Sequence, residues 1–187
     1  MRIEIILGSQ SPRRRELLAG MGVPFTAVNI HADESCPSNL EGASIPIYIS
    51  RAKADTYKAQ LKPGQLLITA DTIVWVDGEQ LGKPADEEDA ARMLRLLSGK
   101  THQVFTGVTL TSLEKQISFS DATDVTFREL TEEEIWHYVR EYKPLDKAGA
   151  YGIQEWIGYV ACTSLRGSYF NVMGLPTEKL YEAMQAF

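Results

Sequence analysis

The sequence contains few of the residues that build disulfide-stapled or metal-bound scaffolds. Its 187 residues include two cysteines, Cys36 and Cys162, and neither belongs to a Cys-X-X-Cys pattern. One bridge between them is possible, but a disulfide framework is excluded, so we expect a protein of the reducing cytoplasm. The three histidines are scattered and form no His-X-X-X-His pair, which argues against a dedicated zinc site.

Long apolar runs are also missing from the sequence. No stretch approaches the roughly 20 apolar residues that a membrane helix needs. The apolar segment at residues 1–8 is too short for a signal peptide and contains Glu4. We therefore expect neither a membrane anchor nor export.

Positive charge is scarce as well. Lys and Arg number 19 against 25 Asp and Glu, which gives a formal net charge of −6 at pH 7. Proteins that bind nucleic acid or anionic membranes need a basic surface, so neither is an expected partner, although a local basic pocket stays possible. With 44% apolar and 24% charged residues, the composition is that of a soluble domain. The length fits one domain or two small lobes.

Strand and helix patterns alternate along the first half of the chain. Short β-branched apolar runs predict strands at residues 3–7, 25–30 and 66–76. Asp77-Gly78 then predicts a hairpin turn. Helices are predicted from Pro12 to about Gly20, over 47–61 and over 86–97.

The second half favours a different arrangement. Two long strands are predicted over 104–113 and 116–127, followed by a helix capped by Thr131 and an irregular glycine-rich stretch at 146–154. Pro176 begins a terminal helix, with Leu180, Tyr181 and Met184 as its apolar positions. Consecutive strands after residue 100 favour antiparallel pairing, so we expect an α/β fold with a mixed twisted sheet and flanking helices.

The first candidate site residues are three consecutive arginines, Arg13, Arg14 and Arg15, in the first turn of the helix that follows Ser9-Gln10-Ser11-Pro12. Cations are unfavourable at the positive end of a helix dipole. The arrangement becomes favourable when the free N–H groups and the guanidinium groups bind a phosphate. The alternative is a solvated basic turn balanced by Glu16.

The second candidate is Asp71, which falls between the apolar stretches of the strongest strand. A buried carboxylate needs a cation, a metal or strong donors beside it. Lys83, just beyond the predicted hairpin, is a plausible partner from its place in the sequence. Three alternatives are open: a functional carboxylate, a buried structural Asp–Lys pair, and an aspartate at a break in the strand.

The third candidate is the stretch from Asp146 to Gln154, in which two glycines allow a ligand to approach the backbone closely. The amide of Gln154 both donates and accepts hydrogen bonds, so it can pair with the imide edge of uracil or thymine. The alternative is an ordinary loop.

Taken in order, these segments resemble the Maf family of nucleoside triphosphate pyrophosphatases from about residue 5 to the C-terminus. The segments that carry the resemblance are Leu-Gly-Ser-Gln-Ser-Pro-Arg-Arg-Arg-Glu-Leu-Leu (7–18), Ala-Lys-Ala (52–54), Ala-Asp-Thr (70–72), Gly-Lys-Pro (82–84), Leu-Ser-Gly-Lys-Thr-His (97–102), Asp-Lys-Ala-Gly-Ala-Tyr-Gly-Ile-Gln (146–154) and Asn-Val-Met-Gly-Leu-Pro (171–176). Three of them, at 11–14, 70–72 and 153–154, look like the dTTP/UTP type. The 7-methyl-GTP type instead resembles Ser-Pro-Tyr and Ser-Asp-Gln at the first two places.

The resemblance implies a single Maf-like domain over residues 1–187, with two lobes around a central cleft and a fold similar to the inosine triphosphate pyrophosphatases. It implies hydrolysis of dTTP and UTP to the monophosphate and pyrophosphate with a divalent metal, and often a homodimer. The position that matches Asp71 is the active-site acid. Positions tied to substrate choice or lining the cleft match Arg13, Thr72, Gln154, Glu34, Lys53 and Lys83.

Three departures from the usual family pattern stand out. Gly8 and Ser50 each stand where alanine is usual, and Tyr142-Lys143-Pro144 replaces Gly-Glu-Pro. Lys143 therefore carries the opposite charge to the family's usual glutamate at this position.

Together, the residues and the resemblance predict a metal-assisted attack of water on the α-phosphorus. Asp71, Lys53 and Lys83 are the expected catalytic residues, and Asp71 and Glu34 the expected ligands of Mg²⁺ or Mn²⁺. The expected substrate-binding residues are Ser9, Arg13, Arg14, Thr72 and Gln154. Three alternatives stay open: a nucleotide-binding regulator of cell division and septum formation, a nucleic-acid binder that uses the arginines, and a preference for CTP or a modified nucleotide.

Overall fold

The computed structural model describes residues 3–187. Met1 and Arg2, which open the apolar segment considered above, lie outside the described residues. The chain divides into two compact units, and each is described by itself. The first unit contains residues up to 72, 106–121 and 174–187, and the second contains 73–105 and 122–173. Each unit is therefore assembled from segments that are far apart in the sequence.

The strands form a mixed sheet in the order β2-β1-β3-β5-β6-β7, with β4 paired to β3. In the first unit, β1 (Glu4–Gly8) runs parallel to both β2 (Phe25–Val28) and β3 (Gln65–Val76), so that Ile6 faces Thr26 on one side and Leu67 on the other. Helical crossovers join these strands, as parallel pairs require. The long strands β5 (Thr101–Thr111) and β6 (Gln116–Phe127) contribute residues to both units.

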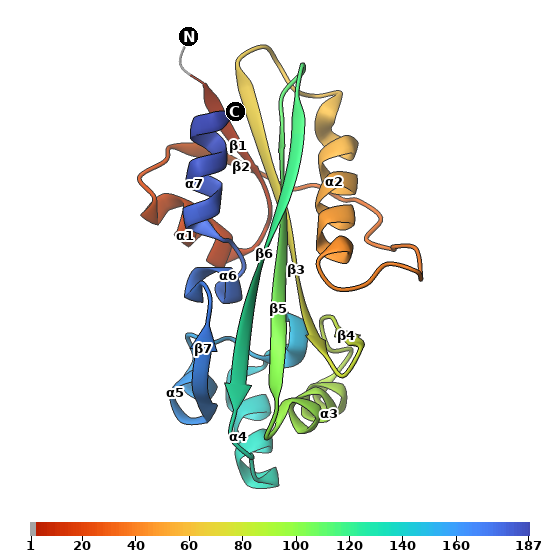
Figure 1. Ribbon diagram of the computed structural model, residues 1–187, viewed down its shortest axis with the longest axis vertical. Helices are drawn as coiled ribbons and strands as arrows, with labels where there is room; N and C mark the ends of the chain where they lie inside the picture. The colour runs from red at the N-terminus through yellow and green to blue at the C-terminus, as the bar shows by residue number, and fades with distance from the viewer. Residues whose placement is uncertain (1–2) are drawn as a thin grey trace. The chain divides into compact units, whose positions relative to one another are not determined.

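Three helices cover the strands of the first unit. Helix α1 (Pro12–Gly20) and helix α7 (Thr177–Ala186) lie on one side, and α2 (Ser44–Lys58) lies on the other (Figure 1). The hydroxyl of Ser11 accepts a hydrogen bond from the N–H of Arg14 at 3.4 Å, and Pro12 takes the first helical position. The start of α1 at Pro12 was predicted, and the Ser11 hydroxyl acts as its N-cap.

The second unit packs its helices around one apolar cluster. It contains β4 (Glu79–Leu81), α3 (Glu87–Leu97), α4 (Glu132–Tyr142), the short 3₁₀ turn η1 (Ala148–Ala150), α5 (Trp156–Ala161), β7 (Cys162–Arg166) and α6 (Tyr169–Met173). Leu94 and Leu97 of α3, Ile135 and Val139 of α4, and Phe127 of β6 lie in this cluster and are all almost fully buried. The apolar spacing of α3 and α4 is thus explained by a shared core.

Local turn and cap chemistry follows the sequence closely. Asp77 and Gly78 both adopt positive φ, 51° and 77°, which is the geometry of the tight turn that joins β3 to antiparallel β4. Thr131 and Glu134 form the reciprocal capping box that begins α4. At the other end of α4, Lys143 adopts φ 45° and its N–H donates to the carbonyl of Val139.

The mixed α/β sheet with flanking helices is confirmed, and the differences are local. Helix α2 begins three residues earlier than predicted, and β2 ends two residues earlier. Three elements were not predicted, α5, β7 and α6, which are each five or six residues long. Tyr181 was predicted on the apolar face of α7, but its side chain is 54% exposed and only Leu180 of that helix is buried, so this assignment was wrong.

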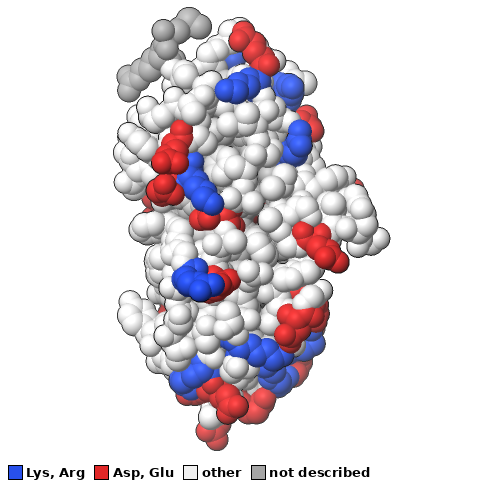
Figure 2. Space-filling model, in the orientation of Figure 1, with Lys and Arg blue, Asp and Glu red and all other residues white. Residues whose placement is uncertain are grey.

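The surface carries both signs of charge. On the face shown in Figure 2, basic and acidic side chains are interspersed and no large area of one sign appears. Within residues 3–187, every helix is too short or too polar to cross a bilayer.

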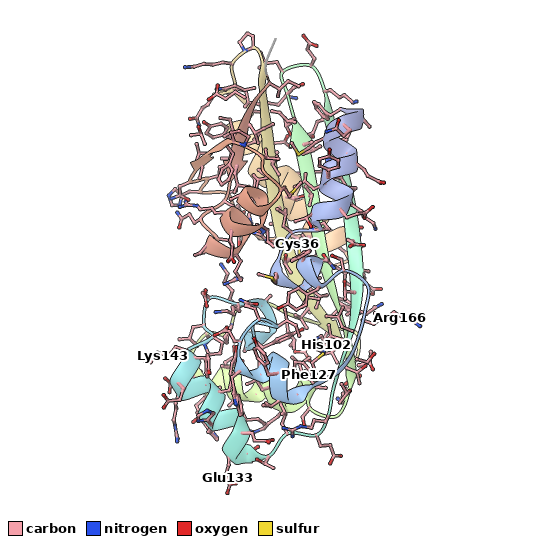
Figure 3. The ribbon with its side chains drawn as sticks, turned by 90° about the vertical axis from the view of Figure 1, so that its left-hand side faces the viewer. Cys36, His102, Phe127, Glu133, Lys143 and Arg166 are labelled. Carbon is pink, nitrogen blue, oxygen red and sulfur yellow. The ribbon has the colours of Figure 1, made fainter. Side chains whose placement is uncertain are left out.

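An imidazole lies inside the core of the second unit. His102 of β5 packs edge-on against Phe127 and Tyr151, with ring centroids 5.1 and 5.3 Å away, and its Nε2 lies 2.5 Å from the Tyr151 hydroxyl (Figure 3). Its Nδ1 has no hydrogen-bond partner among the described residues. Burial lowers the pKa of His102 to about 4, because the enclosed imidazolium loses its hydration.

This lowered pKa predicts loss of stability in mild acid. The unfolded chain takes up a proton near the ordinary histidine pKa of about 6.5, whereas the folded chain resists it until about pH 4. Stability therefore rises with pH across this window and falls by about 3 kcal/mol as the pH drops through it. His102→Gln should flatten this dependence in urea unfolding at about pH 7 and 4.5, and the exposed control His31→Gln should not. An equally steep dependence in His102→Gln would contradict the assignment.

Candidate active site

The carboxylate predicted on the strongest strand is indeed largely enclosed. Asp71 lies on β3 after five consecutive buried residues, and its side chain is only 16% exposed. The ammonium of Lys53 lies 3.1 Å from Asp71 Oδ1 and 3.0 Å from Glu34 Oε1, and it donates to the carbonyl of Ala70 at 3.4 Å. One lysine thus bridges two carboxylates. The cation beside Asp71 is Lys53, eighteen residues earlier in the chain, whereas Lys83 had been the partner expected from its place in the sequence.

Close packing of α2 fixes the position of Lys53. The hydroxyl of Thr69 on β3 donates to the carbonyl of Ser50 on α2 at 2.7 Å, and the Ser50 hydroxyl lies 2.8 Å from that of Thr109. A Cβ on Gly107 would lie 2.3 Å from the backbone of Pro46, so only glycine lets α2 approach β5 this closely. Ser50, where the family usually has alanine, therefore joins the helix to two strands.

Arg14 is the second cation near Asp71. Its Nε donates to the carbonyl of Gly174 at 2.7 Å, and its Nη2 donates to the Thr72 hydroxyl at 3.0 Å. The Thr72 hydroxyl also lies 2.8 Å from that of Thr106. Arg14 is thus held between β3 and the segment that leads into α7. The alternative of a solvated basic turn fails for this residue, although Arg15 is exposed.

Burial is the main cause of the pKa shifts of Asp71 and Arg14. The pKa of Asp71 is raised, chiefly because the carboxylate is desolvated, and the charges of Lys53 and Arg14 offset this only in part. Burial likewise lowers the pKa of Arg14, against the attraction of Asp71. A carboxyl with a raised pKa in a group of cations is typical of functional sites.

The other predicted residues of the first unit lie around the start of α1. Ser9 is buried, and its hydroxyl accepts the N–H of Ser11 at 3.1 Å. Arg13 is partly buried in the first turn of α1. Their expected contact with phosphate stays a prediction.

Lys83 and Gln154 belong to the second unit, where the backbone brings their segments together. The N–H of Gly149 donates to the carbonyl of Gly82 at 3.1 Å. Gly149 adopts φ 69°, and a Cβ there would lie 2.7 Å from the side chain of Val74. The glycine is therefore required for the contact between the Lys83 segment and the loop that carries Gln154.

Sequence reasoning missed a polar network next to Gln154. The Tyr138 hydroxyl donates to Glu155 Oε1 at 3.2 Å and accepts the N–H of Gly152 at 3.0 Å. Lys147 lies 3.2 Å from Glu155 Oε1 and 2.9 Å from Asp146 Oδ1. The one available indication was the Asp-Lys pair of the glycine-rich stretch, because Tyr138 looked like an ordinary apolar position of α4.

The described residues fit a cation that shares its ligands with a substrate. Within residues 3–187, no group of three or more His, Cys, Asp and Glu side chains could hold a metal ion by itself. Asp71 and Glu34 still supply two carboxylates at one ammonium. Mg²⁺ commonly binds one or two carboxylates and takes its remaining ligands from water and substrate phosphates.

These features define an α/β protein whose first unit gathers carboxylates and cations at the middle of one strand. The chain belongs to the Maf-like protein family, whose model matches residues 4–187. The resemblance stated from the sequence motifs is therefore confirmed.

Several relatives cover nearly the whole chain. The dTTP/UTP pyrophosphatase of Bacteroides thetaiotaomicron is 60% identical over 95% of this chain and 93% of its own length. The proteins of the same name from Porphyromonas gingivalis and Flavobacterium psychrophilum are 50% and 45% identical, over 98% and 95% of this chain and 94% and 91% of their own. Among solved structures, a HAM1 protein from Coxiella burnetii aligns with 99% of this chain and 100% of its own, at 13% identity and a TM-score of 0.49.

The raised pKa of Asp71 predicts that Asp71→Asn stabilises the fold at neutral pH. A carboxyl whose pKa rises on folding costs stability as the pH increases from the ordinary value of about 3.9 through the raised one. The amide does not titrate and keeps the shape. Asp71→Asn should therefore unfold at higher urea than the wild type near pH 7 and at similar urea near pH 3.

The exposed variant Glu16→Gln is the control for the loss of one negative charge. If Asp71→Asn were less stable than the wild type near pH 7, the attraction of Lys53 and Arg14 would outweigh the burial of the carboxylate.

Proposed function

We propose that this chain hydrolyses dTTP and UTP to the monophosphate and pyrophosphate, as house-cleaning of nucleotide pools. The family membership and the relatives named dTTP/UTP pyrophosphatase support this reaction. The observation that carries it in the structure is the enclosed Asp71 carboxylate, held by Lys53 beside Glu34. Carboxylates and fixed cations at one point are what phosphoryl transfer requires, because its catalysis is mostly positioning and charge stabilisation.

We assign Asp71 and Glu34 as the residues that would hold a divalent cation, Mg²⁺ or Mn²⁺. When bound, such a cation neutralises phosphate charge and polarises the phosphorus. Lys53 contacts both carboxylates and keeps their side chains in place.

We also assign Asp71 as the residue that accepts the proton of the attacking water. Its raised pKa makes the Asp71 carboxylate a better base than an exposed aspartate. After Asp71 has released the proton to solvent, Lys53 stabilises the carboxylate that forms again. The water oxygen bonds to the α-phosphorus, the bond from that phosphorus to the bridging oxygen breaks, and pyrophosphate leaves. As the pH falls through the pKa of Asp71, turnover is lost.

The remaining cations would hold the phosphate oxygens. We assign this role to Arg13, Arg14 and Lys83, with Ser9 at the start of α1. Arg14 acts from a fixed position, since two of its nitrogens already donate to Gly174 and Thr72.

Base recognition is assigned to the glycine-rich loop. Gln154 Oε1 is buried and has no hydrogen-bond partner among the described residues, so it can accept the N3–H of uracil or thymine. Thr72 is the family position tied to substrate choice in the first unit.

We further propose a cytoplasmic protein that acts on free nucleotides without nucleic acid or membrane, and a homodimer as its assembled form.

The direct test is a nucleotide panel with Mg²⁺: dTTP, UTP, CTP, GTP and 7-methyl-GTP, with pyrophosphate and orthophosphate measured separately. We expect pyrophosphate from dTTP and UTP, and loss of turnover by at least about a thousandfold in Asp71→Asn while the fold survives. Nucleotide binding without turnover by the wild type would instead support a regulatory protein. Full activity of Asp71→Asn would refute the role of this residue.

A second test concerns the base. Gln154→Ala removes the amide that pairs with the imide edge, and a lost hydrogen bond of this kind costs about 1–3 kcal/mol. We expect the variant to lose preference among pyrimidine triphosphates more than it loses maximal rate, measured as kcat/KM for UTP, dTTP and CTP. Unchanged selectivity would show that Gln154 does not recognise the base.

A further inference from the structure

The amide of Gln154 is held in an asymmetric environment. Its oxygen is buried and has no donor among the described residues. Its nitrogen approaches the backbone of Gly152: a Cβ on that glycine would lie 3.1 Å from Gln154 Nε2 and 2.5 Å from Glu155 Oε1. The amide nitrogen and the Glu155 carboxylate thus share the space above one glycine.

The orientation of this amide decides which pyrimidine it fits. Uracil and thymine present an N3–H donor next to a carbonyl, so they need the amide oxygen at N3 and the amide nitrogen at the carbonyl. Cytosine presents an N3 acceptor next to an amino group, which is the reverse pattern. An amide that rotates freely about its last bond would accept both bases, so selection requires something that prevents the flip.

We propose that Glu155 is a specificity-determining residue, which fixes the Gln154 amide with its nitrogen toward the carboxylate and its oxygen toward the base. The negative charge attracts the N–H groups of the amide and repels its oxygen. Flipping the amide would place its oxygen in the space next to Gly152 that its nitrogen now shares with Glu155 Oε1. This inference rests on the proposed function and adds a residue that selects imide bases over cytosine.

The carboxylate is itself fixed from two sides. Tyr138 donates to Glu155 Oε1 and at the same time accepts the N–H of Gly152, so one buried hydroxyl ties the carboxylate to the backbone beneath the amide. Lys147 contacts Glu155 and Asp146, which leaves the group of three with one net negative charge. Glu155→Gln removes that net charge and leaves an oxygen that can still accept from Tyr138.

The experiment compares UTP with CTP on the wild type, Glu155→Gln and Glu133→Gln. Glu133 lies exposed on the outer side of α4, so its variant matches the loss of charge without touching the network (Figure 3). Binding is measured by calorimetry with non-hydrolysable α,β-imido analogues, and turnover by kcat/KM. We expect the UTP-to-CTP ratio to fall roughly tenfold in Glu155→Gln, mainly through better use of CTP, and to stay unchanged in Glu133→Gln.

Two further variants separate positioning from stability. Tyr138→Phe removes the hydroxyl that holds Glu155, and Val139→Ala destabilises the same helix from a buried position outside the network. Both should lower the urea midpoint, but only Tyr138→Phe should lower the UTP-to-CTP ratio. If Val139→Ala lowered the UTP-to-CTP ratio as much as Tyr138→Phe does, Glu155 and Tyr138 would have only a structural role.

The outcomes distinguish this inference from the proposed function. If the wild type prefers UTP and Glu155→Gln keeps that preference, the inference is overturned and the proposed function stands. If the wild type binds the UTP analogue selectively without turnover, the proposed reaction fails, and the binding ratio alone decides the role of Glu155. If the wild type binds the two analogues equally well, the inference is overturned.

Discussion

The enclosure of one carboxylate at the middle of a strand constrains much of the first unit. An unpaired charge in this position would be very unfavourable, so the fold must bring cations to Asp71 from elsewhere. Lys53 comes from α2, which is locked against β3 and β5 through Ser50 and Gly107. Arg14 comes from α1 and is locked by Gly174. Both helices and the last segment of the chain thus help to hold cations near the Asp71 carboxylate. The pKa of Asp71 is still raised, because these cations offset the desolvation of the carboxylate only in part.

The second unit also holds a carboxylate through several neighbouring polar groups. A buried tyrosine hydroxyl connects a helix, a glycine N–H and a carboxylate, and a lysine balances that carboxylate. These contacts join α4 to the glycine-rich loop. In both units a polar side chain of the candidate site is held by charged or hydroxyl-bearing neighbours, and glycines allow the surrounding segments to approach.

Much of the fold could be predicted because its signals are local. The cap at Ser11, the turn at Asp77-Gly78 and the capping box at Thr131 each act within a few residues. The helices and strand after Glu155 were missed because each has only five or six residues, too few for a clear apolar period. The contact of Lys53 with Asp71 was not predicted for a related reason: nearness in sequence favoured Lys83 as a partner, whereas the pairing of Lys53 with Asp71 depends on how α2 packs. Likewise, Tyr138 has the spacing of a core residue, and only the structure shows what its hydroxyl contacts.

The hydrogen bond from Arg14 to Gly174 has a consequence for biosynthesis. The two residues are 160 positions apart, although both belong to the first unit. A chain emerging from the ribosome exposes Arg14 long before its acceptor exists, and the second unit is made in between. The surroundings of Asp71 are therefore completed only when the last segment has been synthesised.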